Sequence, residues 1–153
     1  MGGQENPNMG SFYTTEIDSV MKLAAARQNQ GKIDLVYYYG ATNKASIVAV
    51  SDAQLADVPA FSECSTWTTR NATKFKLTSG IDWSTITDES GITANATDLT
   101  VTHINQLNVN DIVAFETAAT SSNPSKKGLY IVKAISGSAG ADRSITIEVK
   151  IQK

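Results

Sequence analysis

The chain is poor in the residues on which several common protein classes depend. It has one cysteine and one histidine among 153 residues, which excludes an internal disulfide and every metal site built on two histidines. Its 13 basic residues do not outnumber its 15 acidic ones. Because phosphate backbones are bound by clustered positive charge, we expect no nucleic acid partner. No apolar run approaches the roughly 18 residues that a membrane-spanning helix requires, so no transmembrane segment is predicted.

Serine and threonine are abundant instead and together make up 32 of the residues. Chains rich in threonine and poor in lysine and glutamate favour strands and exported surfaces over helical cytosolic enzymes. Residues 1–10 are polar and glycine-rich, with no basic region followed by an apolar stretch, so they predict a flexible leader without a signal peptide. We therefore place a single domain at residues 11–153, a length that fits one hydrophobic core.

The N-terminal half predicts short helices beside buried strands. Residues 20–27 are good helix formers, preceded by an Asp-Ser pair that can cap a helix and followed by a stop at Gly31. Residues 33–39 are apolar on both faces, as in a strand that is covered on two sides, and residues 46–50 form a second short apolar run. Between residue 51 and Val58 a brief helix is expected, capped by the Ser-Asp pair at its start.

The C-terminal third gives the clearest pattern, with strands at residues 111–117, 128–135 and 144–151. In the last of these, apolar and polar residues alternate over four repeats, which indicates a half-buried antiparallel strand. A Gly/Ser turn at 136–140 and one polar loop separate the three strands, so they predict an antiparallel meander. The fold class is therefore α+β: a mixed sheet with one or two short helices in the N-terminal half and a three-strand C-terminal meander. Residues 88–110 are polar and turn-rich and give no assignment.

No familiar catalytic pattern is present. The stretch Gly137–Gly140 is similar to a phosphate-binding loop, but a strand follows it where such a loop needs a helix, so we interpret it as a hairpin turn. His103 is the only imidazole base, and no nucleophile motif accompanies it. Cys64 has no neighbour in sequence that would lower its pKa, and a structural thiol is expected.

Clustered carboxylates are the remaining candidates for catalysis, namely Asp82, Asp88 and Glu89. Paired carboxylates hydrolyse glycosides when they are held about 5–9.5 Å apart, but aspartates in loops commonly cap helices and turns. We therefore predict no enzyme activity, no metal site and no cofactor. A small hydrolase that uses a carboxylate or histidine site of an unrecognised kind is the alternative.

Aromatic and polar residues offer a candidate ligand-binding site. Trp67, Arg70 and Asn71 lie in a threonine-rich stretch that predicts an irregular surface loop, and loops on rigid scaffolds often hold ligands. Tyr38 points to the opposite face of its strand from its tyrosine neighbours, and tyrosine rings can stack on sugars. The competing interpretation is structural: Trp67 fills the core, Arg70 bonds loop carbonyls and the tyrosines are core residues. The binding hypothesis requires Trp67, Arg70 and Asn71 to be partly exposed and close together.

Several segments resemble those of Bacteroides-type surface lipoprotein domains of unknown function. They are Lys32–Thr42, Trp67–Phe75, Asn110–Thr117, Lys127–Lys133 and Ile145–Lys150. The resemblance covers most of the domain in segment style and order, and it carries no catalytic signature. It implies export to the cell envelope or outer surface of a Gram-negative bacterium, with a lipid anchor upstream of this chain. The lipid-bearing cysteine of such proteins is absent here, because Cys64 is internal.

The function expected from these observations is that of a non-catalytic exported or cell-surface domain. Its partner would be a glycan, a peptide or another protein.

Overall fold

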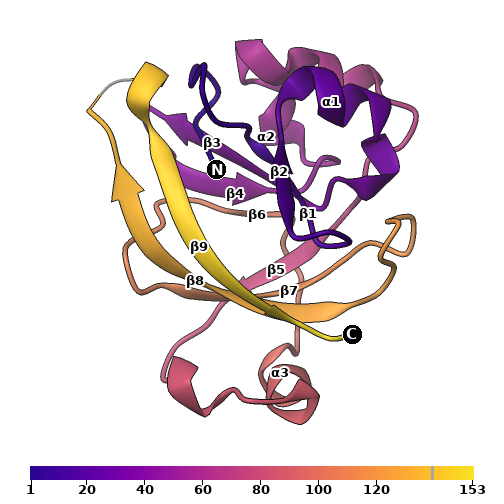
Figure 1. Ribbon diagram of the computed structural model, residues 1–153, viewed down its shortest axis with the longest axis vertical. Helices are drawn as coiled ribbons and strands as arrows, with labels where there is room; N and C mark the ends of the chain where they lie inside the picture. The colour runs from indigo at the N-terminus through magenta and orange to yellow at the C-terminus, as the bar shows by residue number, and fades with distance from the viewer. Residues whose placement is uncertain (139) are drawn as a thin grey trace.

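The computed structural model describes residues 1–138 and 140–153 and contains two antiparallel sheets packed face to face, with short helices on the outer side of each (Figure 1). The first sheet has the strand order β2-β1-β3-β4-β6 and the second has β5-β7-β8-β9. The α+β class is confirmed, with the strands divided between two sheets. The strands are β1 Phe12–Thr14, β2 Ser19–Met21, β3 Leu35–Gly40, β4 Lys44–Val48, β5 Lys74–Leu77, β6 His103–Ile104, β7 Ile112–Glu116, β8 Lys127–Ser136 and β9 Ser144–Ile151.

The main core lies between the two sheets. Successive side chains of a strand point to opposite faces, so each strand directs every second residue into this core. The largest buried side chains there are Tyr13, Leu35, Tyr37 and Ile47 from the first sheet, and Phe75, Phe115, Tyr130 and Ile145 from the second.

Strand β3 is buried on both faces, as its apolar sequence predicted. Leu35 and Tyr37 face the main core, while Val36 and Tyr38 belong to a second cluster on the outer side of the sheet. The helical segments in this half of the chain are α1 Leu23–Gln28, η1 Gln30–Lys32, α2 Ala53–Ala56 and η2 Pro59–Thr66. Side chains from α1, α2 and η2 fill the second cluster.

The helix expected from residue 20 begins later than predicted. Residues 19–21 form β2, in which Val20 lies opposite Tyr13 of β1, and α1 starts only at Leu23. Pairing with β1 overrides the helix propensity of this stretch, and β-branched Val20 suits the strand. The second helix is capped as predicted, because the Asp52 side chain accepts a hydrogen bond from the Gln54 backbone N–H at 2.8 Å.

The C-terminal strands form the predicted antiparallel meander β7-β8-β9, and β5 extends it at the β7 edge. Its outer face is covered by α3 Glu89–Asn95, which lies below the sheets in Figure 1 and whose Ile92 belongs to a third cluster together with Leu129 and Ile131. Two short 3-10 segments, η3 Trp83–Thr85 and η4 Gly140–Asp142, complete the elements. The turn predicted at 136–140 includes residue 139, which lies outside the described residues.

The first ten residues lie against the domain, where the sequence predicted a segment without structure. The Met1 amino group donates to the carbonyl of Ile145 at 2.7 Å, and the Gly3 backbone N–H donates to the carbonyl of Arg143 at 2.7 Å. The Gln4 side chain bonds both backbone groups of Tyr39. Polar and glycine-rich composition therefore misled the prediction here, because backbone pairing needs no apolar side chains.

None of the helices in the described part of the chain has both the length and the apolar character needed to cross a membrane.

Candidate functional site

Trp67 does not lie on an exposed loop, so the exposure that the ligand-binding hypothesis requires of it is not found. It follows the last residue of η2 and is 7% exposed, with its ring 5.7 Å from that of Phe12 between centroids. The same cluster holds Phe61 and Cys64. Residues 61, 64 and 67 recur every three positions, and a 3-10 helix has three residues per turn, so all three face the sheet.

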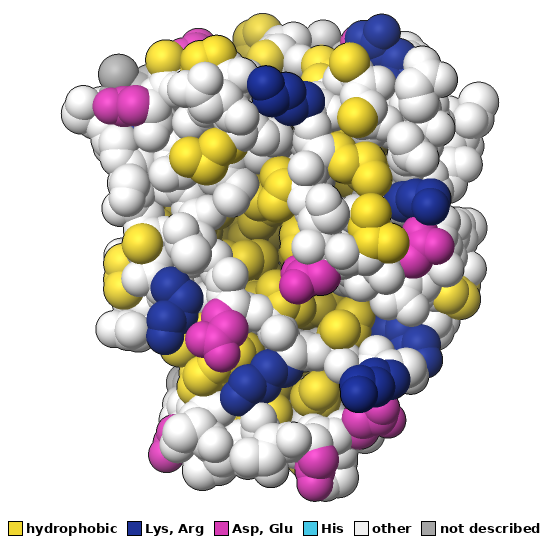
Figure 2. Space-filling model, in the orientation of Figure 1, with side chains coloured by type: hydrophobic (Ala, Val, Ile, Leu, Met, Phe, Trp, Pro, Cys, Tyr) yellow, Lys and Arg dark blue, Asp and Glu magenta, His cyan; other side chains and the backbone are white. Residues whose placement is uncertain are grey.

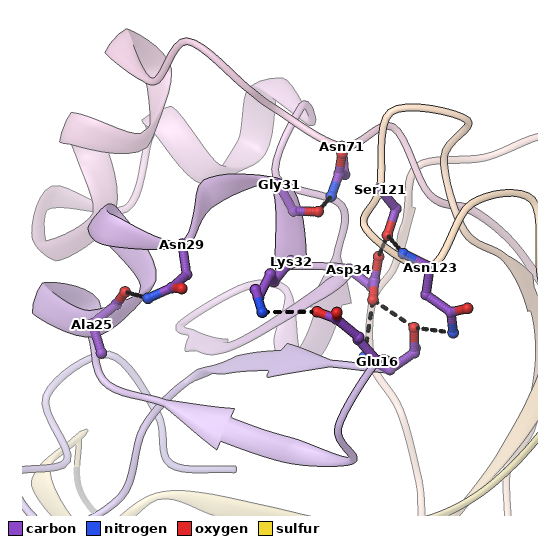
Figure 3. A network of polar contacts seen from close by, with 10 residues as sticks. Glu16, Ala25, Asn29, Gly31, Lys32, Asp34, Asn71, Ser121 and Asn123 are labelled. Carbon is purple, nitrogen blue, oxygen red and sulfur yellow. Dashed lines mark hydrogen bonds and ion pairs between the residues drawn. The ribbon is translucent and has the colours of Figure 1, made fainter.

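Asn71 is also buried, and its side chain holds the backbone (Figure 3). Its amide donates to the carbonyls of Gly31 at 2.9 Å and Ile33 at 2.8 Å, and its oxygen accepts from the Thr120 hydroxyl at 2.9 Å. Arg70 is exposed. The predicted cluster of exposed Trp67, Arg70 and Asn71 is therefore not formed, because two of the three side chains point inward.

A buried carboxylate lies beside Asn71 in the same polar network (Figure 3). Asp34 accepts hydrogen bonds from the backbone N–H of Thr15 at 2.9 Å, from the Thr15 hydroxyl at 2.7 Å and from the Ser121 hydroxyl at 2.6 Å. Burial raises the pKa of Asp34, even though these donors oppose the shift. The network joins the end of β1, the start of β3 and the loop after β7, which is a structural role.

Tyr38 lines a hollow of about 400 Å³ at the end of β3, with polar and apolar residues in its wall. Its hydroxyl donates to Gln54 at 2.9 Å and accepts from the Asn43 amide at 2.9 Å. Gln4 and Asp57 also line the hollow. Only 3% of Tyr38 is exposed, so the hollow offers hydrogen bonds to a ligand but no open ring face for stacking on a sugar.

His103 forms an ion pair or hydrogen bond with a carboxylate that the sequence did not connect with it. Its Nδ1 lies 2.9 Å from Asp52, and the Thr102 hydroxyl donates to the same carboxylate. Burial alone would raise the pKa of Asp52, but the hydrogen bonds from Thr102, His103 and Gln54 together hold it below its ordinary value. An Asp–His pair can orient an imidazole for base catalysis, but none of the hydrogen bonds among the described residues joins His103 to a nucleophile.

The other residues considered as catalytic candidates have structural roles. Burial raises the pKa of the Cys64 thiol to about 12, which leaves it protonated at neutral pH. Asp82 accepts from the backbone N–H of Ser84 and Asp88 from that of Gly91, so both cap helical turns. Across residues 1–138 and 140–153, no group of three or more His, Cys, Asp or Glu side chains is placed to hold a metal ion.

An opening with apolar side chains on its floor lies between the two sheets, where β2 and β9 face one another. We call this opening, of about 620 Å³, the β2–β9 groove. Figure 2 shows a hollow at the centre of this face, with hydrophobic side chains gathered in it. Its apolar lining comes from Met1, Tyr13, Val20, Ile145, Ile147 and Val149.

The rim of the β2–β9 groove is polar. The Tyr13 hydroxyl donates to Asp18 at 2.7 Å, and Lys133 lies 3.7 Å from Glu148 across β8 and β9. The pKa of Tyr13 is raised by burial first and by the Asp18 carboxylate second. A small apolar floor with a polar rim is the usual anatomy of a protein interaction site.

Both walls of the groove are edge strands, β2 of the first sheet and β9 of the second. In the part of the chain that the structure describes, β2 pairs only with β1, and β9 pairs only with β8 apart from a short contact near residue 144. Unpaired backbone groups at a sheet edge are a template for another strand. The sequence signalled the alternation in β9, but it could not signal which edge of which sheet would lack a neighbour.

The comparisons with known proteins concern the fold. No family model and no curated protein matches the chain. It is similar to the crystal structure of a DUF4466 family protein from Parabacteroides merdae, with a TM-score of 0.64 and 18% sequence identity. The match covers 95% of this chain and 50% of that one, so this chain spans about half the length of the protein it matches. At this identity the likeness shows a shared fold.

Proposed function

We propose that this chain is a non-catalytic binding domain of an exported or cell-surface protein, and that it holds a segment of a partner polypeptide in the β2–β9 groove. The observation that carries this proposal is an opening with an apolar floor whose two walls are edge strands, with β2 unpaired on its outer side and β9 paired there only near residue 144 among the described residues. Apolar side chains and unpaired N–H and C=O groups are together what a polypeptide segment recognises.

A glycan is a weaker candidate for the partner. Sugars are bound by exposed aromatic faces combined with polar side chains. Trp67 and Tyr38 are both buried, so the hollow beside Tyr38 offers polar groups but no open aromatic face. In the β2–β9 groove, apolar side chains such as Ile147 and Val149 lie beside a polar rim, which suits a polypeptide segment better than a sugar.

The proposed export of the protein is supported by sequence resemblance and composition, and not by the groove. The segments quoted above resemble Bacteroides-type surface lipoprotein domains, and the structure of similar fold comes from a Parabacteroides species. The abundance of serine and threonine agrees with an exported surface. A lipid anchor upstream of this chain is part of the same proposal.

The hydrolase alternative depends on the Asp52–His103 pair. It would need a hydroxyl or water positioned at the second nitrogen of His103, together with an adjacent concave surface for substrate. If His103→Gln and the wild type are equally inactive on ester and glycoside substrates, the non-catalytic proposal stands. A hydrolysis rate that depends on His103 would overturn it.

A peptide selection tests the proposed function. A library of random peptides about twelve residues long is displayed and enriched on the wild-type domain, and each enriched peptide is then titrated against two variants. Val20→Lys places a charge in the groove at a side chain that is 41% exposed, and Leu77→Lys makes the same change on β5 at a side chain that is 49% exposed. Leu77 lies outside the groove, so it is the matched control.

We expect enriched peptides that lose at least about tenfold in affinity with Val20→Lys and bind Leu77→Lys like the wild type, because an unpaired charge in an apolar site is costly. Failure to enrich any peptide that distinguishes the two variants would overturn the proposal. Oligosaccharides titrated in parallel would support the glycan candidate if their binding were lost on Asn43→Ala and kept on Val20→Lys.

A further inference from the structure

Residues 1–3 already form a short antiparallel strand on β9. Met1 and Ile145 exchange both backbone hydrogen bonds, with N–O distances of 2.7 Å from Met1 and 2.9 Å from Ile145. Gly2 lies opposite Ser144 as an antiparallel bridge, and Gly3 donates to Arg143. The Met1 side chain packs against the main core. The edge of β9 is therefore able to accept a strand, and the first residues of the chain show the direction in which that strand runs.

Beyond Ile145 the same edge of β9 continues without a strand partner in the described part of the chain. In an antiparallel strand, alternate residues direct their N–H and C=O groups to the same edge. The backbone groups of Ile147, Val149 and Ile151 therefore face the edge that Ile145 uses for Met1. Lys133 is the extra residue of a bulge on β8, so β9 itself keeps a regular alternation.

The side chains of Ile147 and Val149 line the same opening. Ile147, Val149 and Ile151 pack against the main core while remaining partly exposed. Ile147 and Val149 line the β2–β9 groove, and Val20 of β2 lines its other wall. Figure 1 places the N-terminus in the gap between β9 and β2, and Met1 itself lines the groove.

We propose that the polypeptide segment bound in this groove adds to β9 as an antiparallel strand, in line with Met1–Gly3, and carries apolar side chains at every second position. This inference rests on the proposed function and specifies how the partner binds. The pairing of Gly2 with Ser144 and Met1 with Ile145 fixes the register. The next position of the added strand lies opposite Thr146 and the one after it opposite Ile147.

The register determines which positions must be apolar. Side chains directly opposite one another in an antiparallel pair share a face of the sheet. Positions opposite Ile147 and Val149 thus face the groove, whereas positions opposite Thr146 and Glu148 face solvent. A shift of one residue would move every apolar side chain of the added strand to the wrong face.

Two extensions of this chain test this mode of binding. Each adds six residues before Met1, three valines and three threonines in alternation. In the in-phase extension, valine occupies the second, fourth and sixth positions counted back from Met1, opposite Ile147, Val149 and Ile151. In the out-of-phase extension, valine occupies the first, third and fifth positions. The two proteins have the same composition and length, so they differ only in the face that the valines share.

The measurement is amide hydrogen exchange of Ile147 and Val149. We expect the in-phase extension to slow it at least about tenfold and the out-of-phase extension to leave it near the wild-type rate, because only the first places apolar side chains in the groove. Equal effects of the two extensions, or no slowing with either, would overturn the strand-addition mode. The proposed function is judged separately: peptides that depend on Val20 would still uphold it, and their absence would overturn it whatever the extensions do.

Discussion

An edge strand of one sheet lies beside an edge strand of the other along two lines, which we call seams. The two seams are built differently. At one seam, a single run of chain bonds both sheets: Val101 and Phe75 of β5 exchange backbone hydrogen bonds, and β6 pairs with β4 directly afterwards. At the other seam, between β9 and β2, the bridging contacts lie at one end, where Gly3 bonds to Arg143, Gly2 bonds to Gly10, and the Arg143 guanidinium lies over the Tyr39 ring. The first seam is closed by a strand, and the second is closed only at one end.

The difference shows in burial at matched positions. Ile47 of β4, beside the closed seam, is fully buried, and it lies opposite Ile104 of β6. Ile147 of β9, at the open seam, packs against the same core but stays partly exposed. Apolar surface left in water at a sheet edge is unfavourable and invites association. The closed seam thus shows, within the same molecule, the burial of apolar side chains that a strand bound in the β2–β9 groove would produce.

Removal of an isoleucine side chain is expected to cost most at the closed seam. Ile47→Ala should lower the free energy of unfolding by about 4 kcal/mol, because it leaves a cavity in a fully buried site. Ile147→Ala removes the same atoms at a partly exposed site and should cost about 1.5 kcal/mol. Urea unfolding of both variants measures the difference.

Equal losses for these two variants would contradict the comparison, since they would mean that the open seam is as well packed as the closed one. The slope of the unfolding free energy with urea should stay the same in both, which checks that the variants unfold from the same native state.

The wall of the open seam depends on the buried carboxylate of Asp34. This side chain holds Thr15 directly after β1 and thereby the turn that leads into β2. Asp34→Ala should cost about 3 kcal/mol, because it leaves the buried N–H of Thr15 without its acceptor. Asp34→Asn keeps an acceptor at the same place and should cost less at pH 7.

The two substitutions also differ in pH dependence. Because burial raises the pKa of Asp34 above its ordinary 3.8, the folded state takes up the proton at a higher pH than the unfolded state does. The contribution of this carboxyl to stability therefore falls as pH rises from 3.8 through the raised value. The advantage of the wild type over Asp34→Asn should be larger at pH 4 than at pH 7. An advantage that grows with pH would show that the hydrogen bonds dominate and that the pKa is lowered.

Much of the fold was predictable from local pattern. The alternation in β9, the doubly apolar run of β3 and the Asp52 cap are properties of short segments, and each appears in the structure as predicted. Val20 was misassigned because its strand depends on Tyr13, a partner that local sequence does not identify. The first ten residues were misassigned for a related reason, since Met1 and Gly3 bond to residues near the other end of the chain.

The candidate site was less predictable than the fold. Trp67 and Asn71 have the residue types of a binding loop, but only their neighbours in space decide that they point inward. The β2–β9 groove carries no sequence motif, because it consists of two edge strands that face each other and are paired, among the described residues, only at the end held by Met1–Gly3. Edges of this kind follow from the order of the strands, which the sequence leaves undetermined.

The smallest expected effect concerns the one bridge at the open seam. A Cβ atom added at Gly2 would lie 2.8 Å from the Cβ atoms of Asn6 and Met9, too close for any rotamer to relieve. Gly2→Ala should therefore move residues 1–3 and cost about 1 kcal/mol. In the control Gly31→Ala, the nearest atom to the added Cβ, in the Ser122 side chain, is 3.7 Å away, an ordinary contact.

Amide hydrogen exchange distinguishes the two seams in these variants. The Ile145 N–H donates to Met1 at the open seam, and the Val101 N–H donates to Phe75 at the closed one. Gly2→Ala should speed exchange at Ile145 by about fivefold to tenfold and leave Val101 unchanged, since about 1 kcal/mol acts on a local opening. Faster exchange at both amides would mean that the seams open together. In that case residues 1–3 would stabilise the whole sandwich, and the open seam would not be an independent binding edge.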